Sequence, residues 1–294
     1  MRPFRFDVNM RSAGSRREWA DKAKKLEDLG YSALTVPDHL ADMFSPMPAL
    51  VSAAEATRHL RVGTNVLNND LRHPVLVARE AATVDVLTEG RLRLAFDAGA
   101  TRVERLAEAV AIVKGLLRGE AVTFAGRHYR VTDHTIHPPP VQRPHPPILI
   151  GGNGRRLLGL AAREADIVGL SGIAFRRGGL EPDLSGWRTA EVGARVRLVR
   201  ETAGDRYDRI ELSALVQRVV VTEARRKADG ELAERWRSLT VDEILQSPYA
   251  LVGTVDELVA DLKARRERWG ISYYVVFEPA VDALAPVVTR LAGR

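Results

Sequence analysis

The chain has 294 residues, 45% hydrophobic and 28% charged, a composition that suits an ordinary globular protein with one large domain over residues 1–294. Its net charge of +6 comes from arginines that alternate with acids, a pattern typical of solvated helix faces, so we expect no nucleic-acid partner. The absence of cysteine excludes disulfides, thiolate nucleophiles and Cys-ligated metals, and no apolar run approaches the roughly 18 residues of a membrane span.

The first part of the chain alternates short apolar strands with amphipathic helices. Ser15 is placed to cap the first helix, and Gly30 to end it. The expected strands are Phe4 to Asn9, Ala33 to Val36, Arg61 to Val66 and Leu92 to Phe96. The helices that follow them are expected from Ser15 to Gly30, from Pro46 or Pro48 to about Arg58, from Pro74 onwards and from about Arg102 to Leu117.

This rhythm breaks once and then resumes. Val122 to Phe124 and His128 to Val131 flank a Gly-containing turn, which predicts a small β-hairpin between the fourth helix and the fifth strand. The Pro-rich stretch from Pro138 to Pro147 reads as an extended linker. The later strands are expected at Ile148 to Ile150, Ile167 to Leu170, Glu211 to Val221 and Tyr273 to Val276, and the later helices from about Gly154, over Trp187 to Thr202, over Val255 to Trp269 and over Ala280 to Leu291.

Eight strands that alternate with helices predict an α/β protein of the (β/α)₈ TIM barrel class, with the hairpin as an insertion. A doubly wound open sheet is the alternative, but the chain lacks a Gly-x-Gly-x-x-Gly turn after its first strand and has more strands than that fold needs. The amino terminus has no apolar signal-peptide core. We therefore expect a cytoplasmic protein that does not bind a membrane.

Polar residues follow five of the predicted strands, at the barrel end where active sites of this fold lie. Because these strand ends meet at one mouth, we expect their side chains to form a site. The candidates are Asp38 and His39 after the second strand, Asn68 to Asp70 after the third, Asp97 to Thr101 after the fourth, the glycines Gly151, Gly152 and Gly154 after the fifth and Ser171 after the sixth.

The glycine-rich turn Gly151-Gly152-Asn153-Gly154-Arg155 follows a strand and opens a helix. Backbone N–H groups and the positive end of a helix dipole then point to one place, which is an arrangement that binds phosphate, and Arg155 would assist. A plain glycine turn between a strand and a helix explains the spacing equally well.

His39 is the candidate proton donor or acceptor, because a histidine titrates near neutrality and Asp38 or another rim group would tune it. The alternative is a histidine that only ties the strand end to its loop. The remaining histidines near the hairpin lack zinc-ligand spacing, so we expect no metal site. The chain also has no Gly-x-Ser-x-Gly elbow and no Walker loop, which leaves hydrolase and kinase functions without their residues.

Several segments, in this order along nearly the whole chain, resemble the bacterial luciferase-like superfamily. They are Pro37-Asp38-His39, Val62 to Leu67, Arg72-His73-Pro74, Glu80 to Leu92, Thr123 to Tyr129, Val141-Gln-Arg-Pro144, Pro147 to Gly152, Glu164-Ala-Asp166, Val252 to Leu258 and Gly270 to Tyr274. Within the superfamily the chain most resembles the actinobacterial branch that depends on the deazaflavin coenzyme F420.

The resemblance implies a barrel with a flavin or deazaflavin across its mouth and hydride transfer between F420 and a small organic substrate. It implies that Gly151, Gly152 and Gly154 hold the cofactor phosphate, with Arg155 and Ser171 as further donors, and that His39 lies near the reactive carbon of the ring. The family often has a non-prolyl cis peptide in the third strand, which falls at Asn65-Val66 and would place that backbone against the ring. Asn68, Asp70, Ala98 and Gly99 would complete the cofactor pocket.

The chain departs from the family pattern after the fourth strand, where Phe96 to Gly99 leads at once into a helix and the usual longer loop is shortened. Two alternatives therefore stay open. One is an FMN-dependent monooxygenase of the same superfamily, which would need a flavin reductase as partner. The F420-dependent enzyme would have an F420 reductase as its corresponding partner. The other is a barrel without catalysis that serves as a binding or assembly protein. The resemblance implies a homodimer in each case, and the identity of the substrate stays open.

Overall fold

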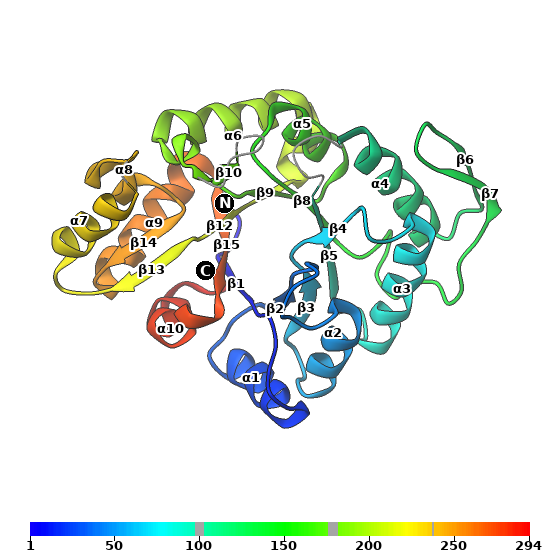
Figure 1. Cartoon of the computed structure of the whole chain (residues 1–294), viewed down its shortest axis with the longest axis horizontal. Helices are drawn as coiled ribbons and strands as arrows, with labels where there is room; N and C mark the ends of the chain where they lie inside the picture. The colour runs from blue at the N-terminus through cyan, green and yellow to red at the C-terminus, as the bar shows by residue number, and fades with distance from the viewer. Residues whose placement is uncertain (98–102, 176–181, 237) are drawn as a thin grey trace.

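Eight parallel strands close into a barrel in the computed structural model, which describes residues 1–97, 103–175, 182–236 and 238–294. Their order around the barrel is β3-β2-β1-β15-β12-β9-β8-β5, and the pairing of β3 with β5 closes the ring. Figure 1 shows this ring of strands surrounded by helices. The barrel strands are β1 (Arg5–Asn9), β2 (Ala33–Val36), β3 (Arg61–Thr64), β5 (Leu92–Asp97), β8 (Ile148–Gly151), β9 (Ile167–Leu170), β12 (Glu211–Leu215) and β15 (Ile271–Phe277).

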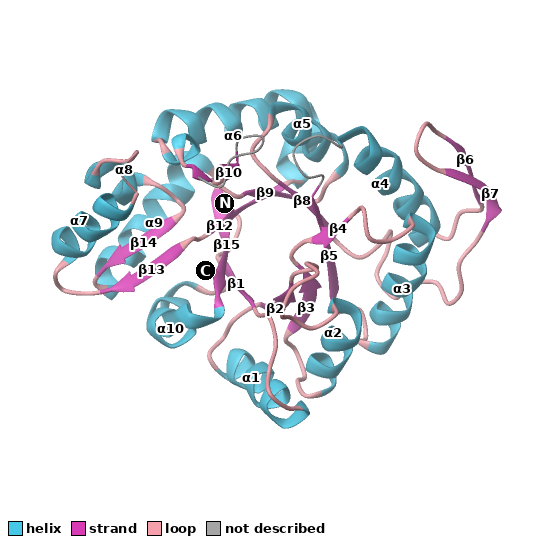
Figure 2. Ribbon diagram, in the orientation of Figure 1, coloured by secondary structure: helices cyan, strands magenta, loops and turns pink. Residues whose placement is uncertain are grey.

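The helices form an outer layer around the strands, as Figure 2 shows. They are α1 (Arg16–Asp28), α2 (Pro46–Glu55), α3 (Pro74–Leu87), α4 (Val103–Leu117), α5 (Arg155–Glu164), α6 (Thr189–Ala203), α7 (Arg225–Arg235), α8 (Val241–Gln246), α9 (Val255–Trp269) and α10 (Val281–Leu291), with the 3₁₀ turns η1 (Ser185–Trp187), η2 (Gly204–Arg209) and η3 (Glu278–Ala280). In the part of the chain that the structure describes, no helix is both long and apolar enough to cross a membrane.

Local sequence signals set the helix ends, and those of α1 were predicted. The Ser15 hydroxyl accepts the Glu18 N–H at 3.2 Å and so caps α1, and Gly30 with φ +79° lies just past its end. At α9 the pair Thr254 and Glu257 forms a reciprocal capping box, and Gly270 ends the helix in the left-handed conformation. Between these ends, α1 buries Trp19, Ala23 and Leu26, and α9 buries Leu258, Leu262 and Trp269.

The third strand is interrupted where the sequence resemblance implied. The Asn65–Val66 peptide bond is cis, and the chain continues as β4 (Leu67–Asn68), which pairs with the end of β5. The short connection expected after the fourth barrel strand falls on residues 98–102, between β5 and α4, and lies outside the described residues. Ala98 and Gly99, predicted as cofactor contacts, lie outside the described residues.

The single strand expected from Glu211 to Val221 is wrong. The structure has two strands there, because the backbone changes partner: the Val216 N–H donates to Val275 O of the barrel at 2.8 Å, and the Gln217 N–H donates to Tyr249 O at 2.7 Å. The second strand, β13 (Arg218–Val221), leaves the barrel and pairs in parallel with β14 (Ala250–Gly253). We call β13, α7, α8 and β14, together with Tyr249 just before β14, the annex. Figure 2 shows its strands and helices outside the barrel.

The amino-terminal end of the barrel is closed by charged and aromatic side chains. Asp7 is fully buried; it accepts a hydrogen bond from the Tyr273 hydroxyl and forms an ion pair with Arg93 at 3.0 Å. Burial and the Asp7 charge together raise the pKa of Tyr273 well above its ordinary value. A second ion pair joins Arg5 to Glu211, and the Arg5 guanidinium lies over the Tyr273 ring at 4.8 Å.

The predicted hairpin is confirmed as β6 (Val122–Ala125) and β7 (Arg130–His134). Glu108 of α4 holds its turn by accepting the backbone N–H groups of Arg127, His128 and Tyr129 at 2.8, 2.9 and 3.0 Å. Two further short antiparallel strands, β10 (Ala174–Phe175) and β11 (Pro182–Asp183), were not expected from the sequence.

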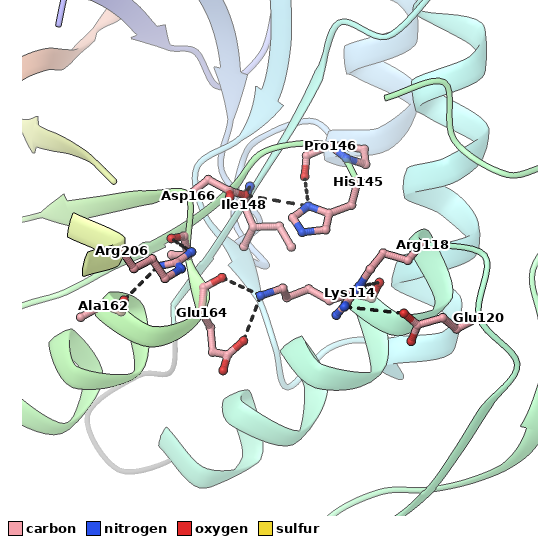
Figure 3. A network of polar contacts seen from close by, with 11 residues as sticks. Lys114, Arg118, Glu120, His145, Pro146, Ile148, Ala162, Glu164, Asp166 and Arg206 are labelled. Atoms are coloured by element: carbon pink, nitrogen blue, oxygen red, sulfur yellow. Dashed lines mark hydrogen bonds and ion pairs between the residues drawn. The ribbon is translucent and has the colours of Figure 1, made fainter. Parts of the chain in front are cut away.

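The Pro-rich linker is tied down at the end of the barrel away from the strand C-termini. Figure 3 shows His145 beside Asp166, whose carboxylate accepts the Ile148 N–H at 2.9 Å where β8 begins. In the same view Lys114 of α4 reaches the carboxylate and the carbonyl of Glu164, each at 2.9 Å. His145 therefore has a structural setting at the opposite end from the predicted site.

Candidate active site

A cavity of about 740 Å³ opens at the carboxyl ends of the barrel strands. Each of the eight strands contributes its last residue, or the residue directly after it, to the lining. These residues are Asn9, Pro37, Asn65, Asp97, Gly151, Ser171, Leu215 and Phe277. The cavity thus lies where (β/α)₈ proteins place their chemistry, as the sequence predicted.

One wall of the cavity is bare backbone. Gly151 of β8 and Gly169 of β9 are paired in register, and both line the cavity. A Cβ added at Gly169 would meet Leu149 Cδ2 at 3.1 Å and Gly151 Cα at 3.2 Å, so any side chain there would crowd its neighbours. Gly152 has φ +153°, and a Cβ on it would come within 2.4 Å of Leu157 Cδ2. Glycine at these positions keeps the wall flat.

The predicted phosphate turn is only partly directed at the cavity. Gly151 and Gly152 line it, but the Gly152 N–H already donates to Gly169 O at 2.9 Å. Gly154 is the N-cap of α5, and its helix start has no side-chain cap. Gly154 and Arg155 are exposed and do not belong to the described lining. The first N–H groups of α5 have no acceptor within the helix, as in any α-helix, and they are the other backbone donors of this turn.

Asn153, which the sequence interpretation did not single out as a site residue, joins two rim segments. Its side-chain amide donates to Ser171 Oγ at 2.8 Å and to Ile173 O at 2.6 Å, and its carbonyl accepts the Gly172 N–H at 3.0 Å. Gly172 has φ +72°, and a Cβ on it would lie 2.5 Å from the Tyr249 ring of the annex. Ser171 lines the cavity with its hydroxyl oxygen already held by Asn153.

The two adjacent candidates Asp38 and His39 lie in different surroundings. His39 is exposed and lines the cavity. Asp38 is buried and lies outside the described lining; its carboxylate forms an ion pair with Arg72 and accepts the Asn68 N–H at 3.3 Å. Asp38 thus fastens the end of β2 to the start of α3, and its described contacts are not with His39.

Asn68 and Asp70 shape the loop after β4 and are not part of the described cavity lining. The Asn68 Oδ1 accepts the Asp70 N–H at 3.0 Å. Asp70 forms an ion pair with Arg105 of α4 at 2.9 Å, and Arg105 also donates to the Tyr129 hydroxyl at 2.9 Å. These contacts join the loop to α4 and the hairpin.

Asn9, at the end of β1, belongs to the lining and was not predicted. Its side-chain amide donates to Asn65 O at 3.2 Å, the carbonyl of the cis peptide, while its Oδ1 has no partner among the described residues. Asn9 is only 8% exposed, so that oxygen is an unused acceptor at the cavity wall. A polar residue at the end of an apolar strand was the signal that could have identified it.

The rim carries charges of both signs. Arg11 is exposed and lines the cavity, and Glu278 lines it while its carboxylate pairs with Lys22 at 2.8 Å. Asp97 ends β5 on the lining and has a partner of its own. Across residues 1–97, 103–175, 182–236 and 238–294, no three His, Cys, Asp or Glu side chains form a group that could hold a metal ion.

Residues 1–273 match the family model described as luciferase-like monooxygenase. An F420-dependent glucose-6-phosphate dehydrogenase from Microbacterium testaceum is 31% identical over 163 residues, which are 48% of this chain and 48% of that protein. This match spans about half the length of the Microbacterium protein. A protein of the same name from Nakamurella multipartita is 28% identical over 283 residues, covering 87% of this chain and 79% of that one.

Solved structures share the fold at lower identity. The coenzyme F420-dependent tetrahydromethanopterin reductase from Methanopyrus kandleri has a TM-score of 0.75 and 17% sequence identity, covering 98% of each chain. This likeness extends over the whole barrel and establishes a common architecture.

Proposed function

Because the chain belongs to the luciferase-like monooxygenase family, we propose that it is an oxidoreductase that uses the deazaflavin coenzyme F420. The observation that carries the proposal is the flat wall of paired glycines in a cavity of about 740 Å³, a volume in the range of small-molecule and cofactor sites. Two relatives named as F420-dependent dehydrogenases support F420 over FMN.

The residues at the mouth fit such a cofactor. Gly151 and Gly169 leave room for a planar ring against backbone, and the unpartnered Asn9 Oδ1 can accept an N–H from it. Asn65 and Val66 line the same cavity and would contact the ring. When bound, the deazaflavin would supply hydride transfer to or from the substrate.

The phosphate of the cofactor is proposed to lie at the start of α5. Gly151, Gly152 and Gly154 form the turn, Arg155 follows it, and Ser171 offers a hydroxyl from the neighbouring strand end. Contacts of Asn68 and Asp70 with the cofactor stay a prediction, as do the one-domain organisation and the cytoplasmic location.

His39 is proposed to exchange the proton that accompanies the hydride, since it is the histidine of the described lining. Asp38 would act on it only through the loop geometry that the Asp38–Arg72 pair fixes. His39→Asn is expected to lower kcat about 100-fold and to flatten the pH profile, with F420 affinity unchanged. His59→Asn, at an exposed histidine outside the cavity, is the control and should keep full activity.

A titration of the purified protein with F420 and with FMN tests the cofactor. Saturable F420 binding and F420-dependent turnover are expected. Tight FMN binding without F420 binding would replace the proposal with an FMN monooxygenase that needs a flavin reductase. Binding of neither cofactor would favour a non-catalytic barrel.

The substrate is proposed to be a small organic compound that shares the cavity with the cofactor. Glucose 6-phosphate, named for both relatives, is the first compound to assay, followed by carbonyl and unsaturated compounds with reduced F420. A substrate that is reduced or oxidised in step with the F420 absorbance would establish the reaction.

We also propose a homodimer. Helix α3 exposes Leu76, Val86 and Leu87 by 50%, 38% and 57%, and a second copy of the chain would remove these side chains from water. Light scattering measures the mass directly, and a mass near 32.4 kDa would contradict the proposal.

A further inference from the structure

A second cavity, of about 540 Å³, lies on the outer wall of the barrel. It is a groove between α6 and α9, which pack against each other and are adjacent in the outer layer in Figure 1. Its lining includes the buried Val196, together with Ala190 and Gly193, small residues three positions apart on α6. It shares no lining residue with the cavity at the barrel mouth.

Three arginines surround this groove without a counter-charge. Arg197 and Arg200 come from α6 and Arg268 from α9, and no carboxylate belongs to the described lining. Among the described residues none of the three forms an ion pair, whereas Arg188, just before the same helix, pairs with Glu243 at 2.8 Å. Arg268 lies over the Trp269 ring at 5.1 Å, which limits the positions of its guanidinium.

The groove also contains an unused indole N–H. Trp269 is 4% exposed and belongs to the lining, and its Nε1 has no acceptor in the described part of the chain. Gly193 faces that nitrogen: a Cβ added there would lie 3.9 Å from Trp269 Nε1. By contrast, the Trp19 indole donates to Ala49 O at 2.9 Å, and the Trp187 indole, also without an acceptor among the described residues, is fully buried and does not line this groove.

We propose that this groove binds a small, multiply charged oxyanion, through phosphoryl or carboxylate oxygens. Three arginines and one indole N–H line it without a hydrogen-bond or ion-pair partner among the described residues, and charge-assisted hydrogen bonds to oxyanions are among the strongest that side chains make. The volume suits a small molecule rather than a bare ion. This site is separate from the proposed F420 site and does not depend on it.

The test follows the indole resonances of the ¹⁵N-tryptophan-labelled full-length protein. The chain has four tryptophans, and the resonance lost in Trp269→Phe identifies Trp269. On titration with pyrophosphate or citrate, up to about 10 mM at constant ionic strength, the Trp269 indole should shift and saturate, while the Trp19 indole should stay in place. Tighter binding of pyrophosphate assigns a phosphoryl ligand, and tighter binding of citrate assigns a polycarboxylate.

Arg197→Ala and Arg268→Ala should each weaken binding about tenfold, because each removes one charge-assisted contact. Arg17→Ala removes the same charge from a 93% exposed side chain on α1 and should change the affinity less than twofold. An unchanged Trp19 resonance verifies that each variant is folded. The proposal would be overturned if neither anion shifts the Trp269 resonance, since binding would then be absent. It would also be overturned if Arg197→Ala, Arg268→Ala and Arg17→Ala bind the anion equally well, since net charge alone would then govern binding.

Discussion

Replacing Arg93 with methionine is expected to lower the free energy of unfolding by about 3–5 kcal/mol, because it leaves the Asp7 carboxylate buried with a single donor. Asp7 is fully buried, and its partners are Arg93 Nη1 at 3.0 Å and the Tyr273 hydroxyl. Its second oxygen, Oδ1, has no partner among the described residues. The variant therefore isolates the cost of an unpaired charge at the closed end of the barrel.

The magnitude follows from the ion-pair distance. Two unit charges 3.0 Å apart attract by about 5–6 kcal/mol at an effective dielectric constant of about 20. Part of this is offset, because Arg93 Nε and Nη2 are themselves buried without partners and methionine removes them. The net loss of unfolding free energy should therefore fall in the lower part of the range of about 3–5 kcal/mol. It should lower the melting temperature by on the order of 10 °C.

Urea unfolding, followed by circular dichroism and by tryptophan fluorescence, measures the change. Asp7→Asn combined with Arg93→Met should be more stable than Arg93→Met alone by about 2 kcal/mol, since no charge is then buried unpaired. Arg17→Met, at a 93% exposed arginine, should change stability by less than about 0.5 kcal/mol. The reasoning is refuted if Arg93→Met costs no more than this control, or if the double variant is no more stable than Arg93→Met.

Three further predictions concern other contacts. Glu27→Ala should cost about 1–2 kcal/mol at neutral pH, because the carboxylate accepts three backbone N–H groups at 2.6–3.1 Å. Burial acts to raise the Glu27 pKa, but these bonds together lower it below its ordinary value of 4.5. The stability difference between Glu27→Ala and wild type should therefore be complete above pH 4.5 and vanish as the pH falls through the lowered pKa. A pH-independent difference in urea midpoints would contradict this. Asn153→Ala should weaken F420 binding about tenfold by freeing two rim segments, and an unchanged affinity in a fluorescence titration would argue against that role. Gly172→Ala should cost about 1–3 kcal/mol more than Gly119→Ala, since both glycines have positive φ but only the first would press a methyl group on the Tyr249 ring; equal melting temperatures would show that the ring gives way.

The barrel strands could be predicted because each is defined by its own residues. A short apolar run between turn residues indicates a buried parallel strand whatever its neighbours are, and the strand expected at Ile148 to Ile150 is found at Ile148–Gly151. The helix start at Ser15 and the hairpin after α4 are local in the same sense. The strand that was misjudged, Glu211 to Val221, changes its hydrogen-bonding partner midway, and that depends on residues far along the chain.

The position of the mouth cavity could be predicted better than the contacts of its residues. The strand ends converge because parallel strands in a barrel share one direction, so His39, Gly151 and Ser171 reach the same cavity. Asp38 was expected beside His39, but its carboxylate is engaged by Arg72, a residue 34 positions away whose side chain no local pattern locates. Asn153 escaped notice for the same reason, since its partners lie on the neighbouring strand end.

Because the backbone changes partner at Gln217, part of the barrel mouth is held in place by the annex. Gln217 lines the mouth cavity and its side chain donates to Ser171 O at 3.4 Å, while its backbone N–H is fixed by Tyr249 of the annex. The annex thus holds one wall residue of the cavity without belonging to the barrel. A substitution in the annex that moves Tyr249 would therefore shift Gln217 at the mouth, although it touches none of the eight barrel strands.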